Sequence, residues 1–129
     1  MPKNYLDKIK LTNKKIYILG GCGLIGSKVV TNTLSVGAKG IILDIKKKKI
    51  PKNVKYEKFD CSNLKNLEKN FIKILKKNGC PDIFINCSYP KTDDWKDCSF
   101  GEITLKRMSK NIEINMNSYA WLSRLVAQK

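Results

Sequence analysis

Three glycines spaced three residues apart, Gly20, Gly23 and Gly26, are the residues of this chain with the clearest chemical use. They follow the apolar run 15–19, predicted as a strand, and they open a segment predicted as a helix over 24–36. This order is typical of the β-turn-α corner that binds the pyrophosphate of a dinucleotide. In such a corner Gly20 allows a tight turn, Gly23 leaves room for the phosphates, and Gly26 lets the helix pack closely on the strand.

The first turn of this predicted helix supplies the groups that would bind phosphate. Backbone amides at a helix start have no partner within the helix, and the helix dipole makes this end positive. We therefore include Leu24 and Ile25 with the three glycines as predicted cofactor-binding residues. A P-loop phosphotransferase is disfavoured, because no Gly-Lys-Ser/Thr run follows the glycines. A methyltransferase with a similar glycine corner stays open as a minor alternative.

An acidic residue stands where a dinucleotide site needs one. Asp44 closes the apolar run 41–44, 18 residues after Gly26, where an acid would bind the hydroxyls of the adenosine ribose. Its charge would repel a 2′-phosphate, which favours NAD over NADP. The nearby Lys46 and Lys47 keep NADP as an alternative. The plainer interpretation is that Asp44 is a turn residue at the end of a strand.

Further polar residues follow the other predicted strands. Asp60 ends the alternating run 54–59, and at the carboxyl end of a parallel strand it could reach an adenine amino group. Its plainer role is to cap the helix that follows. The next strand, 82–86, ends in small polar residues that would let the nicotinamide-ribose half of a dinucleotide pass: Asn86, Cys87 and Ser88.

Asn115 lies within the predicted final helix. It shares one face with Ile112, Tyr119 and Leu122 at helical spacing. Because a buried asparagine needs hydrogen-bond partners, we expect a polar group to face it.

The elements that position these residues alternate between strands and helices, which predicts a Rossmann-type doubly wound parallel sheet with right-handed crossovers. We predict one domain over 1–129, with four strands in the order 3-2-1-4 of an incomplete dinucleotide-binding fold. On the first helix, the inner stripe is predicted as Leu24, Ile25, Val29, Val30 and Leu34. The predicted strands are 15–19, 41–44, 54–59 and 82–86, and the helices are 24–36, 62–77 and 103–128, with a long loop over 87–101.

Composition narrows the function classes. The net charge is +15, but Arg107 and Arg124 are the only arginines, so base-specific nucleic-acid recognition is not expected. No apolar run approaches the ~20 residues of a membrane span, and the first residues lack an apolar signal core, so we expect a cytoplasmic protein. Five cysteines without any histidine disfavour a zinc or haem site. No metal is therefore predicted.

Taken together, these residues resemble the short-chain dehydrogenase/reductase family. The run from Leu19 to Gly26 resembles its T-G-x-x-x-G-x-G loop, with Leu19 in place of threonine. Asp60-Cys61 resembles its adenine-contacting acid, which adds Cys61 to the cofactor-binding residues. The string 86–89 resembles N-N-A-G, with Tyr89 in place of glycine. The string 86–90, which ends in Pro90, is similar to a bacterial subgroup associated with flagellin and surface-sugar modification.

The resemblance implies an activity and its residues. Such an enzyme transfers a hydride between NAD(P) and a hydroxyl or carbonyl of a small substrate, and it works as a homo-oligomer. The subgroup similarity implies a sugar-related substrate. Ile114-Asn115-Met116 resembles the segment that holds the catalytic asparagine. The family also uses a Tyr-x-x-x-Lys pair, and none of the five tyrosines here has a lysine four residues later. The interpretation is a fragment that covers the N-terminal half and is inactive alone. A stand-alone nucleotide-binding or interaction module is the alternative, and a polyanion binder is a weaker one.

Overall fold

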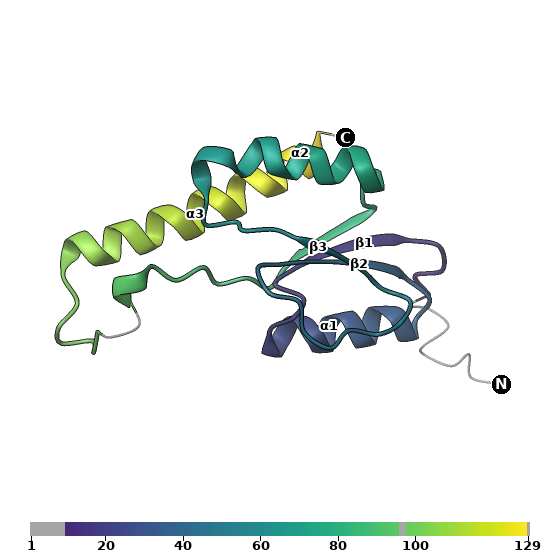
Figure 1. Ribbon diagram of the computed structural model, residues 1–129, viewed down its shortest axis with the longest axis horizontal. Coiled ribbons are helices and arrows are strands. Elements are labelled where there is room, and N and C mark those ends of the chain that lie inside the picture. The colour runs from purple at the N-terminus through teal and green to yellow at the C-terminus, as the bar shows by residue number, and fades with distance from the viewer. Residues whose placement is uncertain (1–9, 96–97, 129) are drawn as a thin grey trace.

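A computed structural model describes residues 10–95 and 98–128 of the chain. Four parallel strands form one sheet in the order β3-β2-β1-β4, which confirms the predicted order. The helices lie on both faces of this sheet, with α1 on one face and α2 and α3 on the other (Figure 1). The strands are β1 (Lys15–Leu19), β2 (Lys39–Asp44), β3 (Lys55–Lys58) and β4 (Ile83–Asn86), and the helices are α1 (Leu24–Ser35), α2 (Leu67–Asn78) and α3 (Leu105–Ala127).

The period-two pattern of β1 divides the core into two layers. Tyr17 and Leu19 face α2 and α3, where they pack with Phe71 and Leu122. Alternate residues of the same strands face the other way, toward Val30 of α1. Because a parallel sheet is covered on both faces, β1 carries apolar side chains at nearly every position. That explains why the continuous run 15–19 marks the centre of the sheet.

Several element bounds differ from the prediction. β2 begins at Lys39 rather than residue 41, because Lys39 and Gly40 already pair with β1 although neither has an apolar side chain. The segment 62–77 contains a 3-10 turn, η2 (Leu64–Asn66), before α2, and the Asn63 side chain accepts from the Asn66 amide at this turn. α3 begins at Leu105, where Thr104 caps it by accepting from the Arg107 amide. Loop 87–101 contains a second 3-10 turn, η3 (Asp93–Trp95).

The predicted inner stripe of the first helix is wrong at its start. Leu24 is 87% exposed and Ile25 is 69% exposed, whereas Gly26 and Val30 are buried. Each residue turns a helix by about 100°, so with Gly26 facing the sheet its two predecessors face solvent. The hydrophobic pattern alone could not reveal this, because the inward position of the first turn carries no side chain.

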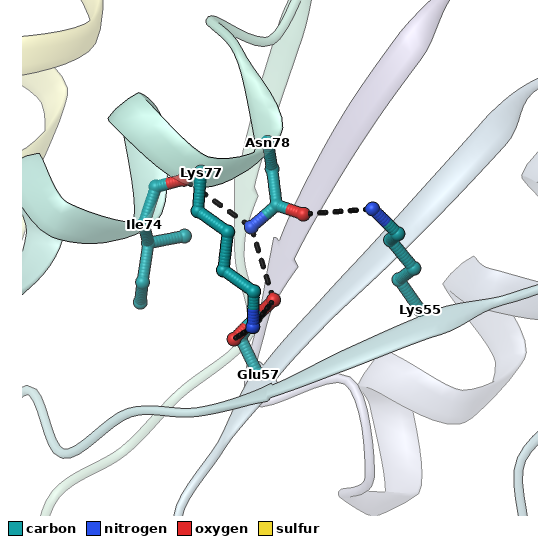
Figure 2. Close-up of polar contacts among 5 residues, drawn as sticks. All are labelled: Lys55, Glu57, Ile74, Lys77 and Asn78. Atoms are coloured by element: carbon teal, nitrogen blue, oxygen red, sulfur yellow. Dashed lines mark hydrogen bonds and ion pairs between the residues drawn. The ribbon is translucent and has the colours of Figure 1, made fainter.

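A polar cluster fastens the outer strand β3 to the end of α2 (Figure 2). The Lys77 ammonium pairs with the Glu57 carboxylate at 2.8 Å, and the Asn78 side-chain amide donates to the same carboxylate at 3.0 Å. Lys55 donates to the Asn78 side-chain oxygen at 3.1 Å. Burial alone would raise the pKa of Glu57, but hydrogen bonds from Lys77 and Asn78 and the neighbouring lysine charges lower the pKa overall.

Within the described residues, no helix is both long enough and apolar enough to cross a membrane.

Candidate dinucleotide cleft

A cleft of about 520 Å³ opens at the carboxyl ends of the strands. Its size is within the range of small-molecule sites, roughly 300–1,000 Å³. In an open α/β sheet this is the edge where ligands bind. The predicted site residues that line it come from four separate chain segments: Gly20, Gly23, Asp44, Asp60, Cys61, Cys87 and Ser88.

Each of the three positions in the corner is occupied by glycine for a different structural reason. Gly20 has a φ of +74°, and a Cβ there would lie 2.7 Å from the Ser88 amide nitrogen. A Cβ at Gly26 would overlap the Gly20 carbonyl oxygen, so the close packing predicted there is present. At Gly23 the only neighbour that the described part of the chain places within 4 Å of an added Cβ is the Gly20 carbonyl oxygen, at 3.2 Å. Gly23 is therefore the glycine whose free side lies toward the cleft.

Gly23 is the N-cap of helix α1, and no side-chain hydrogen bond caps this helix end. The first hydrogen bond along the helix runs from the Ser27 amide to the Gly23 carbonyl at 3.0 Å. The amides of Leu24, Ile25 and Gly26 precede this bond, and such amides have no acceptor within their own helix. Although these three residues do not line the cleft, their helix starts at its wall, with its positive end toward it.

Asp44 lies at the end of β2, on the rim of the cleft. One carboxylate oxygen accepts from the Cys22 amide at 2.9 Å, and the other accepts from the Lys46 amide at 3.3 Å. Lys46 and Lys48 also line the cleft, so cationic side chains stand beside this carboxylate. Asp44 can thus both hold the turn and bind the ribose hydroxyls, because each of its carboxylate oxygens retains a lone pair.

Asp60 and Cys61 follow β3 and lie on the same side of the cleft. The Asp60 carboxylate accepts from the Ser62 amide at 2.9 Å and from its hydroxyl at 2.6 Å, which is a turn contact. The prediction that Asp60 caps the following helix is wrong, because Asn63 caps η2. The Cys61 thiol donates to the Ser88 hydroxyl at 3.5 Å. Burial raises the pKa of Cys61, which keeps this side chain a neutral thiol.

The segment after β4 closes the other side of the cleft. The Asn86 side-chain oxygen accepts from both the amide and the hydroxyl of Ser88, at 2.9 and 2.7 Å. Asn86 itself does not line the cleft, whereas Cys87 and Ser88 do. Burial raises the pKa of the Cys87 thiol as well. Asn86 and Ser88 thus hold each other in place, and the small side chains of Cys87 and Ser88 leave this side of the cleft unfilled.

Asn115 is one layer behind this wall rather than in it. It is 7% exposed, and its side-chain amide donates to the Pro90 carbonyl at 3.0 Å, so the expected polar group does face it. The Tyr119 hydroxyl donates to the Asn115 side-chain oxygen at 2.6 Å. The predicted helix face is wrong at Ile112, which is 49% exposed. Asn111, one residue earlier, is buried instead.

Sequence reasoning missed several residues of the site. Tyr89, Pro90, Lys91 and Asp93 line the cleft from the loop after β4, and Lys48 lines it from the lysine run. No periodic pattern marks loop residues, so the sequence carried no signal for them. Asn111 could have been found, since it lies four residues before Asn115 on a helix.

Comparisons with solved structures agree with this fold. No family model matches the sequence, and no curated protein matches it significantly. A short-chain dehydrogenase from Leptospira borgpetersenii with bound NAD+ matches in structure with a TM-score of 0.72 and 28% identity, over 96% of this chain and 48% of that one. A 4-hydroxyisoleucine dehydrogenase complexed with NADH matches with a TM-score of 0.71 and 26% identity, over 90% of this chain and 49% of that one. The fold of a 2-keto-3-deoxy-D-gluconate dehydrogenase from Streptococcus agalactiae matches with a TM-score of 0.70 and 21% identity, over 91% of this chain and 46% of that one. The chain thus spans about half the length of these structures.

Proposed function

We propose, on the premise that this chain resembles the N-terminal half of a short-chain dehydrogenase/reductase, that it binds a nicotinamide dinucleotide in the cleft at the strand ends. The observation that carries the proposal is the side-chain-free start of α1 at Gly23 beside the Asp44 carboxylate, in one cleft. The start of α1 would bind the pyrophosphate, and the Asp44 carboxylate would bind the adenosine ribose. The NAD+ and NADH in two similar structures support this assignment.

Within this proposal, NAD is the preferred cofactor and NADP the alternative. The Asp44 carboxylate faces the cleft, where a 2′-phosphate would meet its charge. Lys46 and Lys48 line the same cleft and would offset part of that repulsion. Asp60 and Cys61 would contact the adenine, and Asn86, Cys87 and Ser88 would bound the nicotinamide-ribose half.

The reaction we propose for the whole enzyme is hydride transfer between this cofactor and a hydroxyl or carbonyl group of a small, sugar-related substrate. The bound nicotinamide would supply the hydride chemistry. Asn115 would act behind the cofactor wall, and the Tyr-x-x-x-Lys pair would come from residues outside these 129. Homo-oligomer formation and a cytoplasmic location belong to the same proposal. Apolar side chains exposed on α3 support the former: Leu105, Met108, Ile112 and Met116.

The binding step is tested by calorimetric titration of the chain with NAD+, NADP+ and S-adenosylmethionine. We expect saturable binding of NAD+, weaker binding of NADP+ and none of S-adenosylmethionine. Binding of S-adenosylmethionine alone would move the chain to the methyltransferases. Binding of none of the three would overturn the proposed function.

A further inference from the structure

One face of α3 contacts three consecutive residues of the cleft wall. The Tyr119 hydroxyl lies 2.7 Å from the Ser88 carbonyl oxygen, and the Asn115 amide donates to the Pro90 carbonyl at 3.0 Å. Between them, the Tyr89 hydroxyl lies 3.4 Å from the Asn111 side-chain oxygen. Positions 111, 115 and 119 recur at intervals of four, so they lie one above another along the helix.

The three helix residues are also joined to one another. The Asn115 amide nitrogen lies 2.9 Å from the Asn111 carbonyl oxygen and 3.2 Å from its side-chain oxygen. The Asn115 side-chain oxygen faces the Tyr119 hydroxyl. The result is a continuous chain of hydrogen bonds, buried at Asn111 and Asn115 and partly buried at Tyr119, that ends on the backbone of Ser88.

The Tyr119 hydroxyl is the group on which this chain depends. It has one proton and two acceptors within 2.7 Å, the Ser88 carbonyl oxygen and the Asn115 side-chain oxygen. Asn115 cannot instead donate to the tyrosine, because its amide nitrogen already faces oxygens of Pro90 and Asn111. Removing the hydroxyl would therefore remove the one donor that these two acceptors share, and one of the two lies on the cleft wall.

We infer that Tyr119 and Asn111 are positioning residues that hold the Ser88–Pro90 wall in the shape that admits the nicotinamide-ribose half of the dinucleotide. The inference rests on the proposed function of the cleft. Asn111 is 4% exposed, and its side-chain amide nitrogen has no hydrogen-bond partner among the residues that the structure describes, so this helix face keeps a buried polar group that core packing alone does not require. Neither residue touches the cleft itself. Tyr119 acts through the Ser88 backbone carbonyl, and Asn111 acts through the Tyr89 side-chain hydroxyl; both Ser88 and Tyr89 line the cleft.

The test compares Tyr119→Phe with Tyr17→Phe. Tyr17 also donates its hydroxyl to a backbone carbonyl, that of Gly79, which follows the carboxyl end of α2, and it does not line the cleft. Both variants lose one hydroxyl and one hydrogen bond to the backbone. Two measurements are made on each chain: the dissociation constants of NAD+ and of ADP, and the hydrogen exchange of the Ser88, Tyr89 and Lys91 amides without ligand.

We expect Tyr119→Phe to weaken NAD+ binding about five- to tenfold, the effect of losing about one hydrogen bond, and to leave ADP binding within about twofold. ADP lacks the half of the ligand that this wall would bound. Exchange at the three wall amides should accelerate in Tyr119→Phe and not in Tyr17→Phe. A purely structural role would instead weaken both ligands equally, or affect both variants alike.

Two results would overturn the inference: an unchanged ratio of the NAD+ and ADP constants in Tyr119→Phe, or unchanged exchange at the wall amides. Failure of the proposed function has a different signature, because the unaltered chain would then bind neither ligand. The exchange measurement needs no ligand, so it tests the wall contacts in that case as well.

Discussion

The Asp44 carboxylate accepts a 2.9 Å hydrogen bond from the backbone amide of Cys22, and so joins the end of β2 to the glycine turn. The two residues come from different segments that meet at the rim of the cleft. One side chain therefore both shapes the turn and presents a negative charge to the ligand. Substitution at Asp44 alters these two effects together unless the replacement retains the acceptor.

The first prediction separates the two roles of Asp44. Asp44→Asn keeps an oxygen for the Cys22 amide and loses the charge, whereas Asp44→Ala loses both. Because the charge opposes a 2′-phosphate, both variants should shift the ratio of NADP+ to NAD+ affinity toward NADP+ by about tenfold. Only Asp44→Ala should also accelerate amide exchange in the turn. Calorimetric titration and hydrogen exchange measure the two effects, and a ratio that stays constant in both variants would remove Asp44 from the site.

The second prediction concerns the open side of Gly23. Gly23→Val should reduce NAD+ affinity at least about 100-fold, because a branched side chain would occupy the space proposed for the pyrophosphate. The fold should be retained, since the Gly20 carbonyl oxygen is the only group that the described residues place near an added Cβ. Gly101→Val is the matched control, because no atom of residues 10–95 and 98–128 lies within 4 Å of a Cβ there. Equal affinity in Gly23→Val and the control would contradict the loop assignment.

A third prediction tests which glycines the fold itself requires. Gly26→Ala should lower the free energy of unfolding by about 3 kcal/mol, because its Cβ would overlap the Gly20 carbonyl oxygen. At Gly40 the nearest atom to an added Cβ is in the Leu34 side chain at 3.5 Å, an ordinary contact. Gly40→Ala should therefore be neutral or stabilising by up to about 1 kcal/mol. Urea unfolding measures both, and a tolerated Gly26→Ala would mean that α1 does not pack as closely as described.

The fourth prediction follows from the cluster at the end of α2. The folded state lowers the pKa of Glu57, so its contribution to stability is present above the unfolded value of about 4.3 and is lost as pH falls through the lower folded value. Glu57→Gln should cost about 1 kcal/mol at pH 7 and progressively less below about pH 4. Glu113→Gln, at an exposed residue of α3, serves as the control. A pH-independent cost would assign the effect to packing rather than to charge.

The sequence predicted the strand order and the glycine corner because both depend on local patterns. β1 is apolar from Ile16 to Leu19, as a central parallel strand must be, and Gly20 directly follows it and lies four residues before α1. The inward position of the first turn of α1 was predicted wrongly because Gly26 fills it without a side chain. Tyr89 was missed because its position depends on a contact with Asn111 of α3, 22 residues away, and Lys91 was missed because its ammonium lies over the Tyr89 ring. Asn111 is an intermediate case. Its spacing of four residues from Asn115 places both on one face of α3, but the spacing does not identify Tyr89 as its partner.

The lysines around the cleft also determine how a ligand would arrive there. Lys46, Lys48 and Lys91 line the opening of a chain whose net charge is +15, and a dinucleotide is an anion. Long-range attraction of this kind accelerates encounter and is screened by salt, with a Debye length of about 8 Å at physiological ionic strength. In stopped-flow experiments the association rate of NAD+ should fall steeply with added salt, while the dissociation rate changes little. The main effect of the many lysines would then be on the rate at which the dinucleotide binds.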